Sequence, residues 1–152
     1  MICYTNNRQI PFEIDELDYD LVSKYTWNTS KLGYITAYNK GKTISMHRLI
    51  MGYPQGVDVD HIDGNKNNNR RSNLRICTRS QNLQNQRKHK SSTSRYKGVA
   101  FHIRSNKWDC RITVFGKVIH LGSYATETEA ALAYNTAAMR YFGEFACLNI
   151  IS

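Results

Sequence analysis

The sequence predicts an α+β protein made of two parts: a strand–loop–strand–helix segment in the middle of the chain, and a three-stranded antiparallel sheet packed on one helix at its end. The first part is indicated by a short apolar strand at 74–78 that runs into a helix-capping pair, Thr78 and Gln81. The second is indicated by three stretches of alternating apolar and polar residues. A second capping pair, Thr126 and Glu129, follows them and begins an alanine-rich helical pattern.

The composition is that of a folded globular protein. Apolar residues make up 41% of the 152 residues and charged residues 22%, and the length suits one ordinary domain or two small ones. No apolar run approaches the ~20 residues of a membrane span, and the first residues lack the basic and apolar regions of a signal peptide. The four cysteines lie too far apart for a metal knuckle, so we expect reduced thiols in a cytoplasmic protein.

The net charge of +9 is unevenly distributed along the chain. Residues 1–42 carry equal numbers of basic and acidic groups, whereas residues 43–91 sum to +6 and residues 92–152 to +3. The positive charge therefore lies on the two parts that carry the motifs. This pattern favours a polyanionic partner such as nucleic acid.

The first segment is expected to support the rest. Residues 15–25 show apolar side chains at helical spacing behind an acidic first turn, which predicts a short amphipathic helix. Stretches 34–38 and 43–50 flank a turn-like sequence around Gly41 and predict a β-hairpin.

The middle segment holds an Asp–His pair, a loop rich in Gly and Asn, and two further asparagines. Asp60 offers hard oxygen ligands suited to Mg²⁺ or Mn²⁺, and the ordinary pKa of His61 suits a base near neutral pH. Since neighbours on a strand point to opposite sides, the chain must bend here for both to serve one site. Asn82 is placed to face back toward Asp60, and Asn73 to bind the His61 ring and fix its tautomer.

Other residues of this segment are expected either to have a structural role or to be alternative metal ligands. His47 is interpreted as a packed strand residue. Asn85 and His89 compete with Asn82 as the last metal ligand, and Asn82 is favoured because it lies on the first turns of the capped helix. The turn residues are interpreted as loop shapers rather than ligands: Asp63, Asn65 and Asn67 to Asn69.

Asp60, His61, Asn73 and Asn82 resemble the HNH nuclease motif, in the variant whose last His is Asn. Residues 46–50 resemble the His-Arg-Leu stretch that precedes this motif in phage and intron homing endonucleases. The resemblance implies a ββα-metal (His-Me finger) nuclease domain in which His61 is the general base. It also implies that Asp60 and Asn82 bind one Mg²⁺ or Mn²⁺, and that Asn73 orients His61 and pins the loop.

The last part of the chain predicts strands at 97–104, 107–114 and 117–122, and a helix that ends at Gly143. Alternation gives the sheet one apolar face, which should pack on the helix, and one basic face. A sheet of this width can enter a DNA major groove. The candidate DNA contacts on the basic face are Lys97, His102, Arg104, Arg111, Thr113 and His120.

Residues 96–99, 121–124, 129–138 and 148–149 are similar to the Apetala-two (ethylene-response-factor) DNA-binding domain, whose strands read major-groove bases. Ala100 replaces an arginine expected in the plant pattern, so a target sequence does not transfer. The basic stretch before this domain adds candidate phosphate contacts: Arg87, Lys88 and Lys90.

These observations predict a support segment at 1–42, a nuclease domain at 43–90, a basic linker at 91–95 and a DNA-binding domain at 96–152. The predicted function is a metal-dependent homing-type endonuclease acting on double-stranded DNA in the cytoplasm of a bacterial or phage-infected cell. No small-molecule cofactor or membrane is expected. The sequence does not decide whether the enzyme nicks one strand or cuts both, or whether it acts as a monomer or a homodimer. The alternatives are a sequence-specific DNA-binding regulator with an inactive nuclease fold and, more weakly, an RNA-binding protein.

Overall fold

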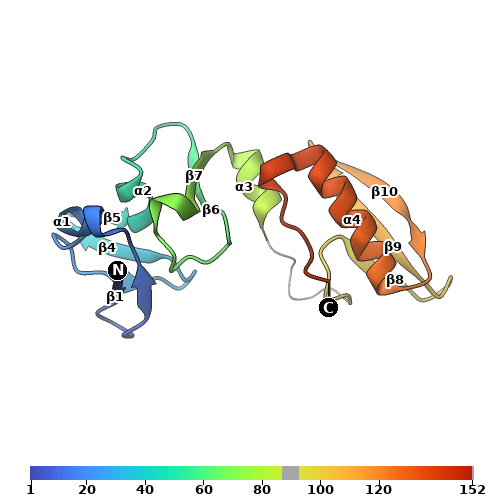
Figure 1. Cartoon of the computed structure of the whole chain (residues 1–152), viewed down its shortest axis with the longest axis horizontal. Coiled ribbons are helices and arrows are strands. Elements are labelled where there is room, and N and C mark those ends of the chain that lie inside the picture. The colour runs from blue at the N-terminus through green and yellow to red at the C-terminus, as the bar shows by residue number, and fades with distance from the viewer. Residues whose placement is uncertain (87–92, 152) are drawn as a thin grey trace. The chain divides into compact units, whose positions relative to one another are not determined.

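The chain folds into two compact units, Met1–Asn82 and Leu83–Ser152, shown in Figure 1. The computed structural model describes residues 1–86 and 93–151. The predicted phosphate contacts Arg87, Lys88 and Lys90 and the alternative ligand His89 therefore lie outside the described residues, as does the first part of the predicted linker. Within the described ranges, no helix is long and apolar enough to cross a membrane.

The first unit is a set of small antiparallel sheets with short helices between them. Strand β1 pairs with β2, and β3, β4 and β5 form a three-stranded sheet in the order β3-β4-β5. The elements are β1 (Ile2–Tyr4), β2 (Pro11–Glu13), η1 (Glu16–Asp18), α1 (Tyr19–Val22), β3 (Asn28–Thr29), β4 (Ile35–Asn39), β5 (Lys42–Ser45) and α2 (Met46–Ile50).

Two predicted elements of this unit were wrong in extent. The helix expected at 15–25 is one turn of 3₁₀-helix followed by the short α1. At its end, the Val22 carbonyl accepts from the Tyr25 backbone N at 3.2 Å and from the indole of Trp27 at 2.8 Å. The strand expected to reach residue 50 ends at Ser45. Met46 and Ile50 lie four residues apart on one face of α2 and are both buried, so burial favours a helix there.

One hydrophobic core holds the unit together. Its members come from both the predicted support segment and the predicted nuclease segment, so residues 1–42 contribute directly to the core that carries the motif. The buried core residues are Phe12, Ile14, Val22, Trp27, Ile35, Ala37, Met46, Ile50, Val59 and Leu74.

A two-stranded ribbon followed by a helix completes the unit: β6 (Asp58–His61), β7 (Leu74–Cys77) and α3 (Arg79–Asn85). The strands are antiparallel, with His61 opposite Leu74. The predicted capping box is confirmed, since the Gln81 backbone N donates to Thr78 Oγ1 at 3.2 Å and the Thr78 backbone N donates to Gln81 Oε1 at 2.8 Å. The boundary between the two units falls inside α3.

The second unit is the predicted sheet packed on one helix. Its antiparallel strands lie in the order β10-β9-β8, and α4 covers one face through a core that includes Cys110, Ile112, Ala130, Tyr134 and Ala138. The elements are β8 (Val99–His102), β9 (Lys107–Val114), β10 (Lys117–Tyr124), α4 (Glu127–Phe142) and η3 (Gly143–Phe145). The capping box at Thr126 and the helix end at Gly143 are confirmed.

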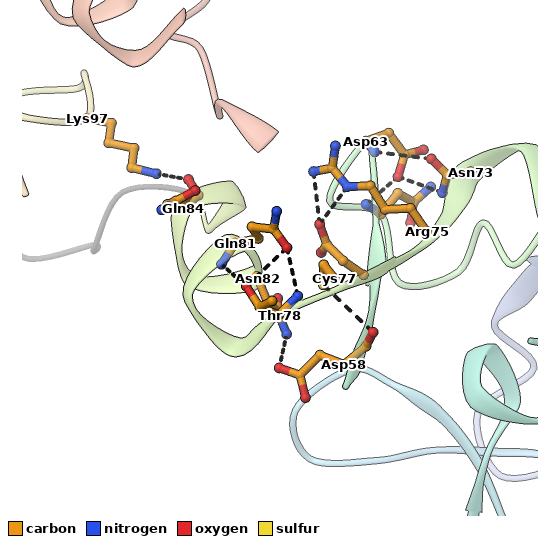
Figure 2. A network of polar contacts seen from close by, with 12 residues as sticks. Asp58, Asp63, Asn73, Arg75, Cys77, Thr78, Gln81, Asn82, Gln84 and Lys97 are labelled. Carbon is orange, nitrogen blue, oxygen red and sulfur yellow. Dashed lines mark hydrogen bonds and ion pairs between the residues drawn. The ribbon is translucent and has the colours of Figure 1, made fainter. Parts of the chain in front are cut away.

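Strand β8 is shorter than predicted. Residues 103–106 form a turn in which the Asn106 backbone N donates to Ile103 O at 3.3 Å, so Ile103 is 84% exposed and does not join the apolar face. Lys97 precedes the strand. Its ammonium donates to Gln84 O at 2.6 Å (Figure 2) and to Gln86 O at 2.5 Å.

We predict that Gly98→Ala strongly destabilises the second unit. Gly98 has φ +76°, and an added Cβ would lie 2.1 Å from Tyr134 Cδ2 and 2.6 Å from Arg111 O, so α4 would have to move off the sheet. The expected loss of unfolding free energy is about 3 kcal/mol or more, measured by hydrogen exchange of the α4 amides in denaturant.

Gly116→Ala is the matched control. Gly116 has φ +77° but open space around the added Cβ, so only backbone strain of about 1 kcal/mol is expected. Equal losses in the two variants would contradict the steric argument.

Candidate active site

The loop between β6 and β7 is closed by Asn73 (Figure 2). Asn73 Nδ2 donates to Asp63 Oδ1 at 2.9 Å and to Asn68 O at 2.8 Å, and its Oδ1 accepts from the Asp63 backbone N at 3.1 Å. Both protons of the amide are thus used within the loop. The predicted hydrogen bond from Asn73 to the His61 ring was wrong, because closing the loop occupies that side chain.

The same loop is tied to the N-terminal segment. The Glu13 backbone N donates to Asn67 O, and the Asn69 backbone N donates to Glu13 O, both at 2.8 Å. Arg71 donates to Asp18, a buried carboxylate, with Nη2 at 2.7 Å from Oδ1 and Nε at 3.0 Å from Oδ2. The predicted support segment, residues 1–42, therefore also fixes the loop that follows His61.

Asn69 takes the role expected of Asn73 at the His61 ring. His61 is 4% exposed, and its Nε2 lies 3.2 Å from Asn69 Oδ1. Asn69 Nδ2 donates to Lys66 O at 3.2 Å, which leaves Oδ1 as the acceptor toward the ring. Nε2 of His61 then carries the proton, and the lone pair lies on Nδ1. The sequence offered no signal for Asn69, which stands in a run of three asparagines.

Burial sets the charge state of the two histidines at this site. Desolvation lowers the pKa of His61, although the Asn69 hydrogen bond and the nearby Asp60 oppose the shift. Desolvation, followed by the adjacent His61, lowers the pKa of His47 to about 4. The two ring centroids lie 5.1 Å apart, and the Tyr34 ring lies 5.3 Å from His47. Both imidazoles are therefore neutral near pH 7, as a general base must be.

A cleft of about 340 Å³ opens beside the Tyr34 and His47 rings, between the β4–β5 sheet, α2 and the ribbon. Hydroxyl, amide and guanidinium groups dominate its polar lining, which suits an anionic ligand such as a phosphate. Its walls are formed by Ser30, Leu32, Tyr34, Thr36, Ser45, His47, Arg48, Asp58, Val59, Arg79 and Asn82. His47 is packed as predicted, but on α2 rather than on a strand.

Asn82 meets Asp58 and not Asp60, which corrects the predicted pairing. Asn82 Nδ2 donates to Asp58 Oδ2 at 2.8 Å (Figure 2). The cause is strand register: α3 begins just after Cys77, whose partner on β6 is Asp58. Asp60 instead pairs with Arg75, its direct neighbour across the ribbon, with Nη2 at 3.1 Å from Oδ2.

The donors gathered here are hard oxygens. Asp58 and Asp60 lie two residues apart, on the same face of β6, and the Asn82 amide lies against Asp58. The Asn82 hydrogen bond is the main reason that the pKa of Asp58 is lowered. Among the residues that the structure describes, no group of three or more His, Cys, Asp and Glu could hold a metal. Carboxylate and amide oxygens are hard donors of the kind that Mg²⁺ and Mn²⁺ prefer.

The polar face of the C-terminal sheet brings together some of the predicted DNA contacts. Arg111 and His120 are register partners, and Thr113 faces Val118. His102 ends β8, with its Nδ1 2.9 Å from Ser105 Oγ. The two other predicted contacts lie off the strands: Arg104 is in the turn, and Lys97 is bonded to the end of α3. The alternative ligand Asn85 is buried at the end of α3.

Comparison with known proteins agrees with a nuclease centred on this ribbon. Residues 46–84, from α2 to α3, match the family model described as HNH endonuclease. The chain is also 40% identical over 139 residues to an uncharacterized HNH endonuclease of Acanthamoeba polyphaga mimivirus, covering 88% of this chain and 71% of that protein. The protein is thus an enzyme of the nuclease class. It belongs to the HNH endonuclease family.

Two further relatives each match only part of the chain. The DNA endonuclease I-HmuI of Bacillus phage SP01 is 50% identical over 52 residues, 31% of this chain and 30% of that enzyme. An AP2-like ethylene-responsive transcription factor of Arabidopsis thaliana is 50% identical over 58 residues of the C-terminal region, 37% of this chain and 17% of that protein. The chain therefore joins a nuclease region to a region similar to plant transcription factors.

We predict that His47 makes the stability of the first unit depend on pH. Its folded pKa of about 4 lies below the ordinary value of 6.5, so the unfolded chain binds a proton that the folded chain excludes. Stability is full above pH 6.5 and falls as the pH decreases toward 4, by on the order of 2–3 kcal/mol.

His47→Phe should flatten this slope in denaturant titrations between pH 6.5 and 4. Tyr34→Phe is the control, since it changes the same cluster without removing a group that titrates in this range. A slope in His47→Phe equal to that of the wild type would count against the assignment.

Proposed function

We propose that this protein is a metal-dependent DNA endonuclease in which the first unit hydrolyses a phosphodiester and the sheet of the second unit holds the DNA. The observation that carries the proposal is that His61 is buried and neutral and that Asn69 holds its ring through a hydrogen bond. His61 lies on the same strand as Asp60. The order β6, β7, α3 and the antiparallel pairing support a ββα-metal arrangement.

His61 is the general base in this proposal. With the proton on Nε2, the Nδ1 lone pair takes the proton of a water molecule, which attacks phosphorus in line with the leaving 3′ oxygen. The products are a 5′-phosphate and a 3′-hydroxyl. Asn69 holds the ring in this tautomer, and Asn73 keeps the loop closed around it.

Asp60 and Asn82 would hold the metal, with Asp58 close enough to Asn82 to add an oxygen. When bound, a Mg²⁺ or Mn²⁺ ion neutralises charge on the phosphate and on the leaving oxygen. The Arg75 ion pair holds the Asp60 carboxylate in place on the ribbon.

The second unit binds double-stranded DNA in this proposal. Arg111, Thr113 and His120 lie on one sheet face, away from α4, and the similarity to plant transcription factors supports DNA as the ligand. We assign nuclease activity to residues 43–90, supported by 1–42, and DNA binding to 96–152. The cleft of the first unit is lined by two arginines, Arg48 and Arg79, which can bind a phosphate and so support a nuclease over a regulator.

We predict that His61→Ala abolishes cleavage while leaving DNA binding within a factor of about two. Loss of a general base should lower the rate by about 10²–10⁴-fold. The assay is conversion of a supercoiled plasmid that the protein retards in gels, with Mg²⁺ or Mn²⁺ present. Open circles would show nicking, and linear product would show double-strand cutting.

Tyr38→Ala, an exposed aromatic residue of the same unit outside the cleft, is the control and should cut normally. Wild-type protein that retards the plasmid and yields no product with either metal would favour the regulator. A His61→Ala variant that cuts at the wild-type rate would overturn the base assignment.

Removal of a proposed ligand should weaken the response to metal. For Asp60→Asn and Asn82→Ala we expect the Mn²⁺ concentration for half-maximal cleavage to rise by more than about tenfold, and EDTA should stop the wild-type enzyme. Asp20→Asn, which removes an exposed carboxylate from α1, is the control. Mn²⁺ binding by calorimetry on the DNA complex gives a readout independent of cleavage, and unchanged binding in both ligand variants would contradict the assignment.

A further inference from the structure

The polar face of the C-terminal sheet carries one acidic side chain among basic ones. Strand register places Asp109 of β9 between Ala100 of β8 and Ser123 of β10. Arg111 lies two residues further along β9, on the same face, opposite His120. The Asp109 side chain is 14% exposed and the Arg111 side chain 61% exposed, so the carboxylate lies beneath and the guanidinium reaches outward.

Both oxygens of Asp109 are engaged. Ser123 Oγ donates to Oδ1 at 2.6 Å, and Arg111 Nη2 lies 3.4 Å from Oδ2. The Ser123 hydrogen bond is the main reason that the pKa of Asp109 is lowered, and His102, His120 and Arg111 add to the effect. Asp109 therefore stays negatively charged at any pH at which this protein would bind DNA.

A fixed negative charge on such a face has a cost for DNA binding. It repels phosphates and so weakens binding to every sequence alike. A hydrogen-bonded carboxylate beside an arginine has a compensating use, because it holds the long side chain in one orientation. An arginine held in this way can present two parallel N–H groups to the O6 and N7 of guanine, which is direct base readout.

We propose that Asp109 is a positioning residue that orients Arg111 toward a guanine and thereby sets sequence specificity, with Ser123 holding Asp109 in place. The inference rests on the proposed function, in which this sheet face contacts DNA. It places the main discrimination of the second unit on the pair Asp109 and Arg111.

Removal of the Asp109 charge should affect affinity and base preference in opposite directions, which simple electrostatics does not predict. Asp109→Asn removes a negative charge, so affinity for random DNA should rise or stay constant. Preference for guanine at one position of the bound site should nevertheless fall by about fivefold or more. Ser123→Ala should shift the preference in the same direction and less strongly, since Arg111 still contacts the carboxylate.

The test is selection from a randomised duplex pool by the full chain in EDTA, which prevents cleavage, followed by affinity measurements on selected and random duplexes. The variants are Asp109→Asn, Ser123→Ala, Arg111→Ala and the double variant Asp109→Asn with Arg111→Ala. Glu144→Gln is the control, because it removes one exposed negative charge of the same unit away from the sheet. Circular dichroism checks that each variant is folded.

We expect Arg111→Ala to lose the same guanine preference, and Asp109→Asn to have no further effect on that preference in the Arg111→Ala background. A wild-type chain that selects a guanine-containing site, together with an Asp109→Asn variant that selects it equally well, would overturn this inference alone. A wild-type chain that binds no duplex DNA would overturn the proposed role of the sheet, and this inference with it.

Discussion

The closed loop between β6 and β7 is the constraint on which the rest of the site depends. His61 ends one strand and Leu74, its register partner, begins the next, so the twelve intervening residues must return to the ribbon without distorting it. The Asn73 amide closes that loop from inside, and the Glu13 backbone holds it from outside. Because Asn69 belongs to the same loop, closure also delivers the hydrogen-bond acceptor for the His61 ring.

Burial determines the protonation state of the two histidines in this site. Two imidazole rings lie 5.1 Å apart with little exposure, and charging either one would place a cation beside the other in a poorly hydrated space. The neutral forms are therefore favoured, which keeps His61 able to accept a proton. The same burial makes the first unit sensitive to acid, so the property that suits His61 to be a base also limits the pH range in which the unit is stable.

The helix caps and strand β9 were predicted well from local sequence, whereas the hydrogen-bond partner of Asn82, which depends on strand register, was not. The capping boxes at Thr78 and Thr126 satisfy helix ends within a few residues, so they can be read directly from the chain. The limits of β9 follow from alternation. Asn82 was expected to face Asp60 and instead donates to Asp58, because the two carboxylates alternate alike on β6 and only the pairing with β7 decides which of them α3 approaches.

The ion pair of Asp60 and Arg75 follows from the same register and has its own consequence. A carboxylate this little exposed is costly to leave without a countercharge, and Arg75, directly across the ribbon, provides one. Removal of Arg75 would therefore take away this countercharge from a nearly buried carboxylate. A divalent ion at Asp60 would supply the same countercharge in a more concentrated form, so it would compete with the Arg75 contact or share the carboxylate with it. Strand register thus places a countercharge within the protein next to Asp60, the carboxylate that we propose as a metal ligand.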